Sequence, residues 1–438
     1  MDIEGYAKRG LKRNDPKLTE KLTDRILEIK DISPERARSL AEAVITEARA
    51  TLEVKDEIIA MQPCGVTMGE FGVGSRGRGD FYAHKKIADV IGKTSAVCDS
   101  SQMDDSGVVN AGGKMVVVTV DGMHSRLSDF PFLAGFHVTR ASLRDLFVMG
   151  ARPVALLSDI HIADDGDVSK IFDYTAGITT VSDLVGVPLV TGSTLRIGGD
   201  MVIGERMTGC VGAVGVADEL TARIQSKPGD VIMVTEGAGG GTVSTTALYF
   251  GMHEVVEKTL NVKFLEACQA LFEHNLIGKI HAMTDVTNGG IRGDAYEIAG
   301  TAGVKLLFYE ERLRKLVEPT VLKMLEQLKI DFLGVSLDAL LIIAPKEHAD
   351  EIMNAVRSKD VAIDIVGEVK EGSGAFLVEN GIEKDFTPRF RESAYTPVKK
   401  IVGEETPMTF EEMQRKVDKA AENAIRKKEQ MVARIRGR

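Results

Sequence analysis

Short runs of β-branched and apolar residues alternate with longer amphipathic stretches along most of this 438-residue chain. The runs predict buried strands, and the stretches with apolar residues at helical spacing predict helices. Strands are expected at 114–122, 152–162, 187–194, 207–217, 227–237, 304–311, 337–345 and 362–369, and helices at 135–151, 168–186, 243–251, 262–275 and 346–358. The rhythm restarts near Ser226, which predicts two halves that each combine a sheet with helices.

The two ends of the chain have helical character without strands. Residues 16–60 are expected to form two amphipathic helices, with Pro34 near the first position of the second one. Residues 409–438 predict a further helix with Thr409 as its N-cap. Basic residues outnumber acidic ones from Arg415 onward. This last helix is expected either to pack on the body or a partner subunit, or to reach a nucleic acid or a protein partner.

These patterns predict an α/β (α+β) protein of four segments. They are a helical N-terminal extension at 1–63, a first α/β domain at 64–222, a second at 223–388 and a helical tail at 389–438. A chain of this length exceeds the size at which a single core keeps growing, which favours two domains with extensions.

Composition excludes several classes of function. There is no Trp and only 5% of residues are aromatic, which argues against aromatic platforms for sugars or single-stranded nucleic acid. The net charge of −10 provides no basic field toward nucleic acid or anionic membranes. No apolar run reaches the ~18 residues of a membrane span, and four dispersed cysteines suit a reducing compartment. We expect a soluble, cytoplasmic protein without a membrane partner, and the composition disfavours nucleic acid as a partner.

Acidic residues gather where predicted strands end. Carboxylates supplied from several separate points of a chain are the usual magnesium ligands around a nucleotide triphosphate. Each one alone would be a cap or turn residue, but their joint occurrence beside glycine-rich segments predicts a Mg²⁺ site. The candidates are Asp104, Asp105, Asp121, Asp145 and Asp285.

Three glycine-rich segments are candidates for phosphate contacts. The segment GVGSRGRGD (72–80) contains no GxxxxGK[ST] motif and follows no clear strand, so neither nucleotide-binding fingerprint is met. EGAGGGTVSTTAL (236–248) follows a strand and opens a helix whose N–H groups could hold an anion. A turn packed against the sheet explains it equally well, and the same two readings apply to TNGGIRGDAYEIA (287–299).

Six segments taken in order resemble the AIR synthase-related (PurM-like) superfamily of ATP-using enzymes. That superfamily includes aminoimidazole ribonucleotide synthetase, formylglycinamidine ribonucleotide amidotransferase, selenophosphate synthetase, thiamine-monophosphate kinase and HypE. The segments are MDDSGVV (103–109), VTVDGMHSRL (118–127), SLRDLFVMGARPVALL (142–157), VPLVTGSTLR (187–196), PGDVIMVTEGAGGGTVSTTAL (228–248) and MTDVTNGGIRGDAYEIA (283–299).

The resemblance implies a PurM-like two-domain fold in which the N-terminal domains of two subunits pair, with ATP in the cleft beside that interface. It implies that four aspartates hold Mg²⁺ on the triphosphate, namely Asp104, Asp105, Asp121 and Asp145. It also implies that the nucleotide site is lined by Gly192 and Thr194. From the second domain, the site would be faced by Asp285 and the backbone of Gly289 and Gly290.

Residues 72–87 fall where relatives carry a mobile glycine-rich loop over the phosphates. The resemblance makes Gly74, Gly77 and Gly79 nucleotide contacts and His84 and Lys85 catalytic candidates, with Arg76, Arg78 and Lys86 as further phosphate ligands. A flexible loop with basic ends suits a lid. The alternative is a linker into a helix with solvated lysines.

The chain also departs from the family pattern. Met103 stands where the family has a Gly, and Arg144 stands where it has an Asn. Ser193 replaces an Asp that would supply one more metal ligand, and Arg126 replaces a Lys. These departures disfavour a purine-pathway role and favour a substrate of its own.

Four other residues carry weaker expectations. His124 is three residues from Asp121, so it could reach the site, but a lone His is more often structural. We expect His137 to be a core or surface residue, Glu297 to lie on a helix surface and Cys64 to be inert.

The expected function is an ATP- and Mg²⁺-dependent phosphotransferase or ligase-type enzyme. It would phosphorylate or activate an amide-type oxygen of a small metabolite and act as a homodimer. The alternative is an ATP-binding maturation or assembly factor, HypE-like in role, that engages a protein partner through its terminal helices. A third reading, a fold that binds no nucleotide, predicts no stabilisation by Mg-ATP.

Overall fold

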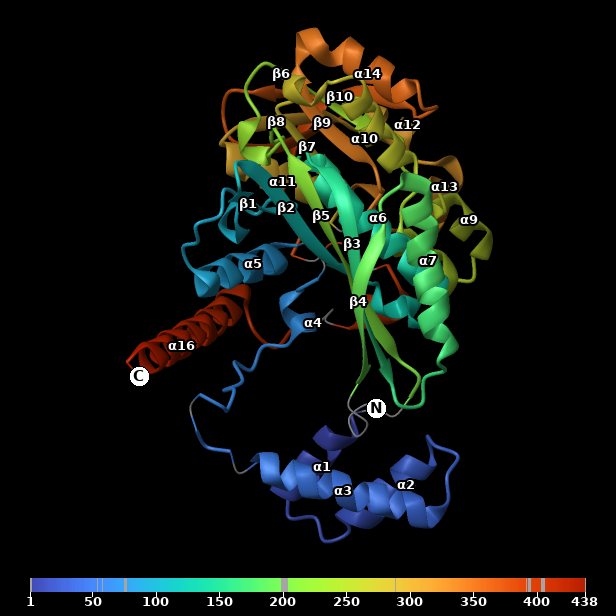
Figure 1. Ribbon diagram of the computed structural model, residues 1–438, viewed down its shortest axis with the longest axis vertical. Helices are drawn as coiled ribbons and strands as arrows, with labels where there is room; N and C mark the ends of the chain where they lie inside the picture. Colours follow the sequence, from blue (N-terminus) through green and yellow to red (C-terminus); the bar gives the residue numbers. More distant parts are fainter. Residues whose placement is uncertain are drawn as a thin grey trace.

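Two β-sheets, one in each half of the chain, organise the fold (Figure 1). The computed structural model describes residues 2–52, 54–56, 58–74, 77–197, 204–287, 289–390, 392, 395–402 and 406–437. Its two sheets confirm the predicted α/β halves. No helix in these ranges is long and apolar enough to cross a membrane.

The first sheet has the strand order β1-β2-β5-β3-β4, and its neighbours are antiparallel except for β3 and β4. Helix α6 packs against strands β2, β3 and β5, and α7 packs on α6. These elements are β1 (Gly107–Ala111), β2 (Lys114–Gly122), α6 (Pro131–Val148), β3 (Arg152–Ala163), α7 (Ser169–Val185), β4 (Leu189–Ile197) and β5 (Met207–Ala217).

The other face of this sheet carries apolar side chains that no described residue covers. Val120 on β2 and Leu157 on β3 are both paired with Gly212 on β5, so the three residues lie on one face. Val118 and Val120 are 41% and 64% exposed, whereas Val117 on the opposite face is fully buried. Alternation along the strand therefore gives the sheet one core face and one open apolar face.

The second sheet has the order β12-β11-β8-β10-β6-β9-β7. Its strands are β6 (Asp230–Thr235), β7 (Ala282–Asp285), β8 (Lys305–Tyr309), β9 (Leu340–Pro345), β10 (Ile363–Lys370), β11 (Gly374–Glu379) and β12 (Ile382–Asp385). Its helices are α8 (Gly241–Tyr249), α9 (Val256–Thr259), α10 (Lys263–Glu273), α11 (Gly290–Ala302), α12 (Glu310–Leu316), α13 (Pro319–Gln327) and α14 (Ala349–Arg357).

The two halves share a core. Leu146 and Val211 of the first half belong to the same buried cluster as Met233 and Ile342 of the second. Helix α10 also packs on α6. Because apolar packing is continuous across the junction, side chains from both halves are held in fixed positions around whatever lies between them.

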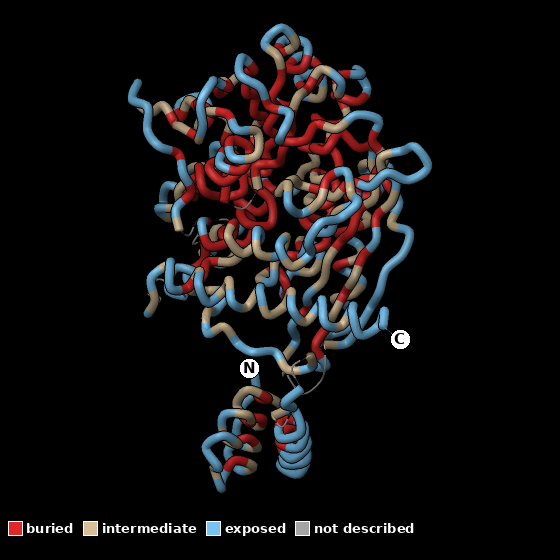
Figure 2. Tube along the Cα trace, turned by 90° about the vertical axis from the view of Figure 1, so that its left-hand side faces the viewer, coloured by how far each residue is buried: buried red, intermediate tan, exposed pale blue. Residues whose placement is uncertain are grey.

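The N-terminal extension forms a small helical unit with a core of its own. Helices α1 (Ile3–Lys12), α2 (Leu18–Leu27) and α3 (Pro34–Leu52) bury Ile3, Leu22, Ile26 and Val44 among themselves. Figure 2 shows this buried cluster apart from the larger buried region of the body. The sequence predicted α2 and α3 but not α1. Lys30 forms an ion pair with Asp165 of the body.

The C-terminal helix α16 (Phe410–Arg436) lies along α5 (Arg78–Ile91), far from it in sequence (Figure 1). Tyr82 of α5 donates a hydrogen bond of 2.6 Å to Asp418. Lys428 donates to the carbonyl oxygens of Val90 and Ile91 at the end of α5, at 2.8 and 2.5 Å. Of the two placements predicted for this helix, packing on the body is the one observed. A short helix precedes each of them in the chain: α4 (Met68–Phe71) precedes α5, and α15 (Pro397–Ile401) precedes α16.

Candidate functional site

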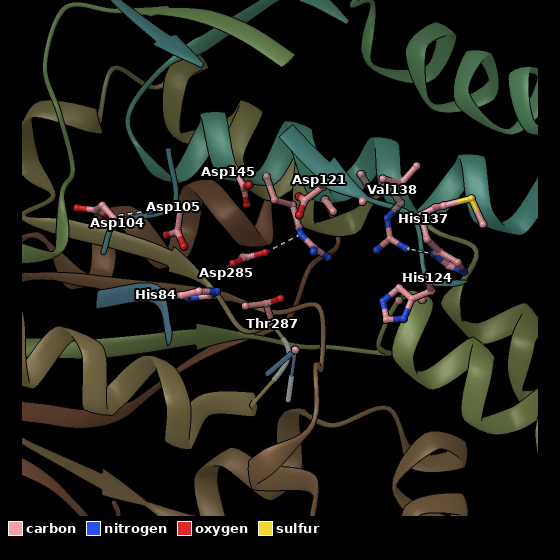
Figure 3. Close-up of a pocket in the computed structure, with 18 of the residues that line it drawn as sticks. His84, Asp104, Asp105, Asp121, His124, His137, Val138, Asp145, Asp285 and Thr287 are labelled. Atoms are coloured by element: carbon pink, nitrogen blue, oxygen red, sulfur yellow. Dashed lines mark hydrogen bonds and ion pairs between the residues drawn. The ribbon is translucent and has the colours of Figure 1, made fainter. Parts of the chain in front are cut away.

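One cavity of about 680 Å³ has walls from both halves and from α5. The first half contributes the end of β2 and helix α6, and the second contributes the end of β7 and the start of α8. Figure 3 shows the carboxylates of the cavity gathered toward one end and two imidazoles at the other. The cavity is therefore polarised along its length.

The acidic end combines carboxylates from four different parts of the chain. Asp121 lies near the end of β2, Asp145 on α6, Asp285 at the end of β7, and Asp104 and Asp105 just before β1. All five predicted acids line the cavity. The fold therefore brings all five candidates to one cavity, although only Asp121 and Asp285 lie at strand ends.

The nearby carboxylates affect the pKa of Asp145. Burial raises its pKa well above the ordinary value, and the carboxylates of Asp121, Asp285 and Asp105 raise it further. Thr119 Oγ1 donates a hydrogen bond of 2.8 Å to Asp145, which opposes the shift. A cluster that resists ionisation in this way gains stability from any cation placed within it.

The acids are not arranged as a closed metal cage. Among the residues that the structure describes, no group of three or more His, Cys, Asp or Glu side chains could hold a metal ion by itself. Such an open arrangement suits Mg²⁺, which keeps several waters and is commonly held by one or two carboxylates together with substrate phosphates.

Arg223 neutralises part of the acidic end. It is 1% exposed, and its Nη2 donates to Asp105 Oδ1 at 2.5 Å while Nη1 donates to Glu297 at 3.0 Å. Its backbone N–H donates to Asp104 Oδ2 at 3.1 Å. Thr284 Oγ1 donates to the second oxygen of Asp105 at 2.9 Å. Both oxygens of Asp105 therefore have protein partners, and Arg223 joins this carboxylate to the second half of the chain.

Arg144 is a second guanidinium at the site, in the middle of the cavity. Its Nε lies 3.0 Å from Asp285, and its Nη1 forms an ion pair with Asp338. Arg140, one turn earlier on α6, forms an ion pair with the other oxygen of Asp338. The departure of Arg144 from the family pattern thus places a positive charge where the sequence comparison expects an amide.

The imidazole end holds one histidine in a network and one without hydrogen bonds. His137 Nε2 lies 2.8 Å from Ser244 Oγ, and its Nδ1 lies 3.4 Å from Arg140 Nη1. The His124 ring has no hydrogen-bond partner among the described residues and faces the cavity (Figure 3). Burial, together with nearby cationic groups, lowers the pKa of His124 to about 4, so this imidazole is neutral at pH 7.

The glycine-rich loop and α5 agree with prediction only in part. Gly74 and His84 line the cavity, and His84 Nε2 lies 3.7 Å from Asp80. Lys85 is exposed and does not line it. A Cβ on Gly77 or Gly79 would collide with a backbone carbonyl oxygen, so these glycines permit close packing of the chain. Arg76 lies outside the described residues.

The remaining glycine and threonine candidates lie away from this cavity within one chain. Gly192 and Thr194 are exposed on the edge strand β4 and line a separate hollow beside α7. Gly290 has a φ of +61°, and a Cβ there would collide with the Leu333 carbonyl, so the turn before α11 needs Gly for packing. Gly289, with a φ of +95°, precedes it. Their roles toward a nucleotide remain predictions.

The prediction that Glu297 lies on a helix surface is wrong, and His137, predicted as a core or surface residue, is a buried one. Glu297 is not on a helix surface: it is 7% exposed and paired with Arg223, because α11 turns that face toward the acidic end. The helical spacing of Ile291, Asp294 and Ile298 was the available signal for this buried face. His137 is buried at the cavity wall. Cys64 lies outside this cavity, in a groove against α16.

The chain belongs to the AIR synthase-related superfamily, whose two domain descriptions match the two halves. The description "AIR synthase related protein, N-terminal domain" matches residues 103–217, and "AIR synthase related protein, C-terminal domain" matches residues 227–379.

Individual relatives differ widely in similarity. "Uncharacterized protein MJ1416" of Methanocaldococcus jannaschii is 53% identical, with 100% of this chain and 99% of the relative covered. A selenide, water dikinase of Myxococcus xanthus is 29% identical over 51% of this chain and 62% of its own length. A thiamine-monophosphate kinase of Pyrococcus abyssi is 25% identical over 63% and 84%.

Solved structures share the fold at low sequence identity. The HypE–HypF complex matches with a TM-score of 0.55 and 20% identity, covering 69% of this chain and 98% of that chain. AaThiL complexed with AMPPCP and TMP matches with a TM-score of 0.54 and 20% identity, covering 75% and 98%.

Proposed function

We propose that the cavity binds ATP with Mg²⁺ and that the protein transfers the terminal phosphoryl group to, or activates, a small-molecule acceptor. The observation that carries this proposal is the convergence of Asp121, Asp145 and Asp285 from both halves of the chain at one end of a single cavity. Relatives crystallised as HypE with ATP and AaThiL with AMPPCP support the choice of nucleotide.

The donor set fits magnesium. Its side chains are carboxylates, the hard oxygen ligands that Mg²⁺ prefers. The raised pKa of Asp145 means that the site stores unfavourable charge repulsion, which a cation relieves. We assign Asp121, Asp145 and Asp285 as the residues that would hold Mg²⁺, with Asp105 kept in position by Arg223. When bound, Mg²⁺ neutralises charge on the triphosphate, and phosphoryl transfer then depends mainly on positioning.

The open face of the first sheet supports pairing of two copies. Val118, Val120 and Leu157 form an uncovered apolar surface on regular strands, and such surfaces commonly mark protein interfaces. In a dimer formed there, the edge strand β4 with Gly192 and Thr194 would approach the partner. Their predicted role in the nucleotide site is therefore proposed for the dimer.

Nucleotide binding is tested first, by thermal unfolding of the full-length protein with Mg²⁺ and ATP. Ligand at ~100 times its dissociation constant stabilises the folded state by ~2.7 kcal/mol. We expect this stabilisation in the wild type and its loss in Asp121→Asn and Asp285→Asn. Lys114→Met, which removes an exposed partner of Asp218, is the control. A wild type that Mg-ATP does not stabilise would show that the cavity does not serve this purpose.

A second candidate is an ATP-dependent maturation or assembly factor that acts on a protein. The separately packed N-terminal helices favour it, as does the HypE–HypF complex among the structural relatives. The two candidates differ in what stimulates turnover. ATP hydrolysis accelerated by metabolite fractions supports a small-molecule acceptor. Acceleration only by a protein fraction supports the assembly role.

A further inference from the structure

The cavity continues beyond the aspartates to the start of α8, where donors from three elements converge. Gly240 is the N-cap of α8, and no side chain caps this helix. The first N–H groups of a helix have no partner within it, and none is found for Gly240 or Gly241 among the described residues. Both glycines line the cavity.

The space in front of Gly240 is large enough for one added carbon without a clash. A Cβ added there would have the Asp338 carboxyl carbon and His137 Nδ1 at 3.8 Å and Arg144 Nη1 at 3.9 Å as its nearest neighbours. Gly241 differs, because a Cβ on it would collide with the His124 ring. The absence of a side chain at Gly240 therefore leaves a recess bounded by the Arg144 guanidinium, the His137 imidazole, the Asp338 carboxylate that both arginines neutralise, and the start of a helix.

Arg144 provides the second, independent indication of a ligand. It is 6% exposed, yet it lines the cavity. Its Nε and Nη1 are committed to Asp285 and Asp338, but no partner of Nη2 is found in the described part of the chain. A guanidinium nitrogen with hydrogens left over inside a cavity is a donor prepared for an acceptor from outside the chain.

The charges at this end point to an anion. Arg140 and Arg144 face Asp285 and Asp338, so the four side chains are balanced. A cation bound at Asp285 would take up one of those negative charges and leave two guanidiniums facing Asp338 alone. The recess would then carry one net positive charge next to the neutral His124.

We propose that this recess binds an oxyanion of the acceptor substrate, a phosphate or carboxylate group, between the Arg144 guanidinium, His124 and the N–H groups of Gly240 and Gly241. This inference rests on the proposed function, which assigns the acidic end to the nucleotide. It makes the acceptor a small anionic metabolite whose charged group lies on the imidazole side of Arg144, with the metal ligand Asp285 on the other side of that guanidinium.

The test uses inorganic phosphate and acetate as probes with the full-length protein, measured by calorimetric titration at saturating Mg²⁺ and AMPPCP. The key variant is Gly240→Ala, whose methyl group would occupy the recess while meeting nothing closer than 3.8 Å. His124→Ala is the second variant, because its removal leaves no hydrogen-bond partner orphaned. Gly300→Ala on α11 is the matched control, since a Cβ there meets only open space.

We expect one of the two probes to bind wild type and Gly300→Ala with millimolar or better affinity. The same probe should bind both recess variants roughly tenfold or more weakly. Stabilisation by Mg²⁺ and AMPPCP should be unchanged in all four proteins. Recess variants that bind the probes like wild type would overturn the assignment. Displacement of AMPPCP by phosphate would also overturn the assignment, because the anion would then occupy the nucleotide's own phosphate site. If neither probe bound wild type, the assignment would likewise be overturned. Failure of AMPPCP to stabilise wild type would instead contradict the nucleotide assignment, which separates the two proposals.

Discussion

Arg223 Nη2 donates a 2.5 Å hydrogen bond to Asp105 Oδ1, so the first turn of the second half holds a carboxylate of the first. The same guanidinium holds Glu297. Replacing Arg223 with Met would leave both carboxylates buried without a cation. Breaking a buried pair in this way costs about 3–5 kcal/mol, which urea unfolding at pH 7 would measure.

The matched control for this change is Arg196→Met. Arg196 pairs with Asp164 but is 77% exposed at its side chain, so its loss should alter stability by less than ~0.5 kcal/mol. If Arg223→Met were as stable as the control, Arg223 would not bind the two halves together as the distances indicate.

Asp145→Asn should increase the stability of the ligand-free protein and remove its response to Mg-ATP. The pKa of Asp145 is raised in the folded state by burial and by Asp121, Asp285 and Asp105. Its burial therefore costs nothing below the unfolded-state pKa near ~4. The cost grows as pH rises toward the folded-state value and is present in full above it. At pH 7 we expect a gain of about 1 kcal/mol in urea unfolding. The exposed Asp218→Asn is the control, and an undiminished Mg-ATP response in Asp145→Asn would contradict the ligand assignment.

His137 should make the protein less stable as pH falls below about 6.5. Burial and the nearby His124 and Arg144 lower its pKa from 6.5 to about 3 in the folded state. The unfolded chain then binds a proton that the folded chain does not, so stability declines from the unfolded pKa downward until about pH 3. One such proton changes the free energy of unfolding by ~1.4 kcal/mol per pH unit.

The measurement is urea unfolding at several values between pH 7 and pH 5, for wild type and His137→Gln. The slope against pH should be shallower in the variant by up to one proton, whatever its absolute stability. The exposed His253→Gln serves as control. Parallel slopes in wild type and His137→Gln would show that this imidazole titrates normally.

A charge on the open face of the first sheet should prevent pairing of two copies. Val120→Lys places an ammonium group on a residue that is 64% exposed in the single chain. Its fold should survive, whereas burial of an unpaired charge in an interface costs several kcal/mol. Sedimentation is expected to report dimers for wild type and monomers for the variant. Val168→Lys, 62% exposed at the start of α7, should remain dimeric. A monomeric wild type would refute the proposed pairing.

Sequence periodicity anticipated most strands of both sheets, because buried strands of Val and Ile differ clearly from the amphipathic helices between them. It missed α1, whose Gly5 and Gly10 reduce helix propensity, and the β11–β12 hairpin, where exposed charged residues blur the alternation. Asp121 and Asp285 were found from their positions at strand ends, and Asp104, Asp105 and Asp145 from the segments that resemble the family. Arg223 was not found, because a buried ion pair between distant segments leaves no local pattern, and the helical spacing around Glu297 indicates its buried face but not its partner. The ion pairs of Arg144 depend on Asp338, which only the folded chain brings near.

The contact between α5 and α16 also bears on how the protein is made. Tyr82 and Asp418 are 336 residues apart, so at ~5–20 residues per second the ribosome needs roughly 17–67 s between them. During that interval Phe71 and Tyr82 lack Phe410, the aromatic ring against which both later pack. The wall of the cavity that carries His84 therefore gains its support only after Phe410 has been made, and a nascent chain has every aspartate of the site before it has a complete site.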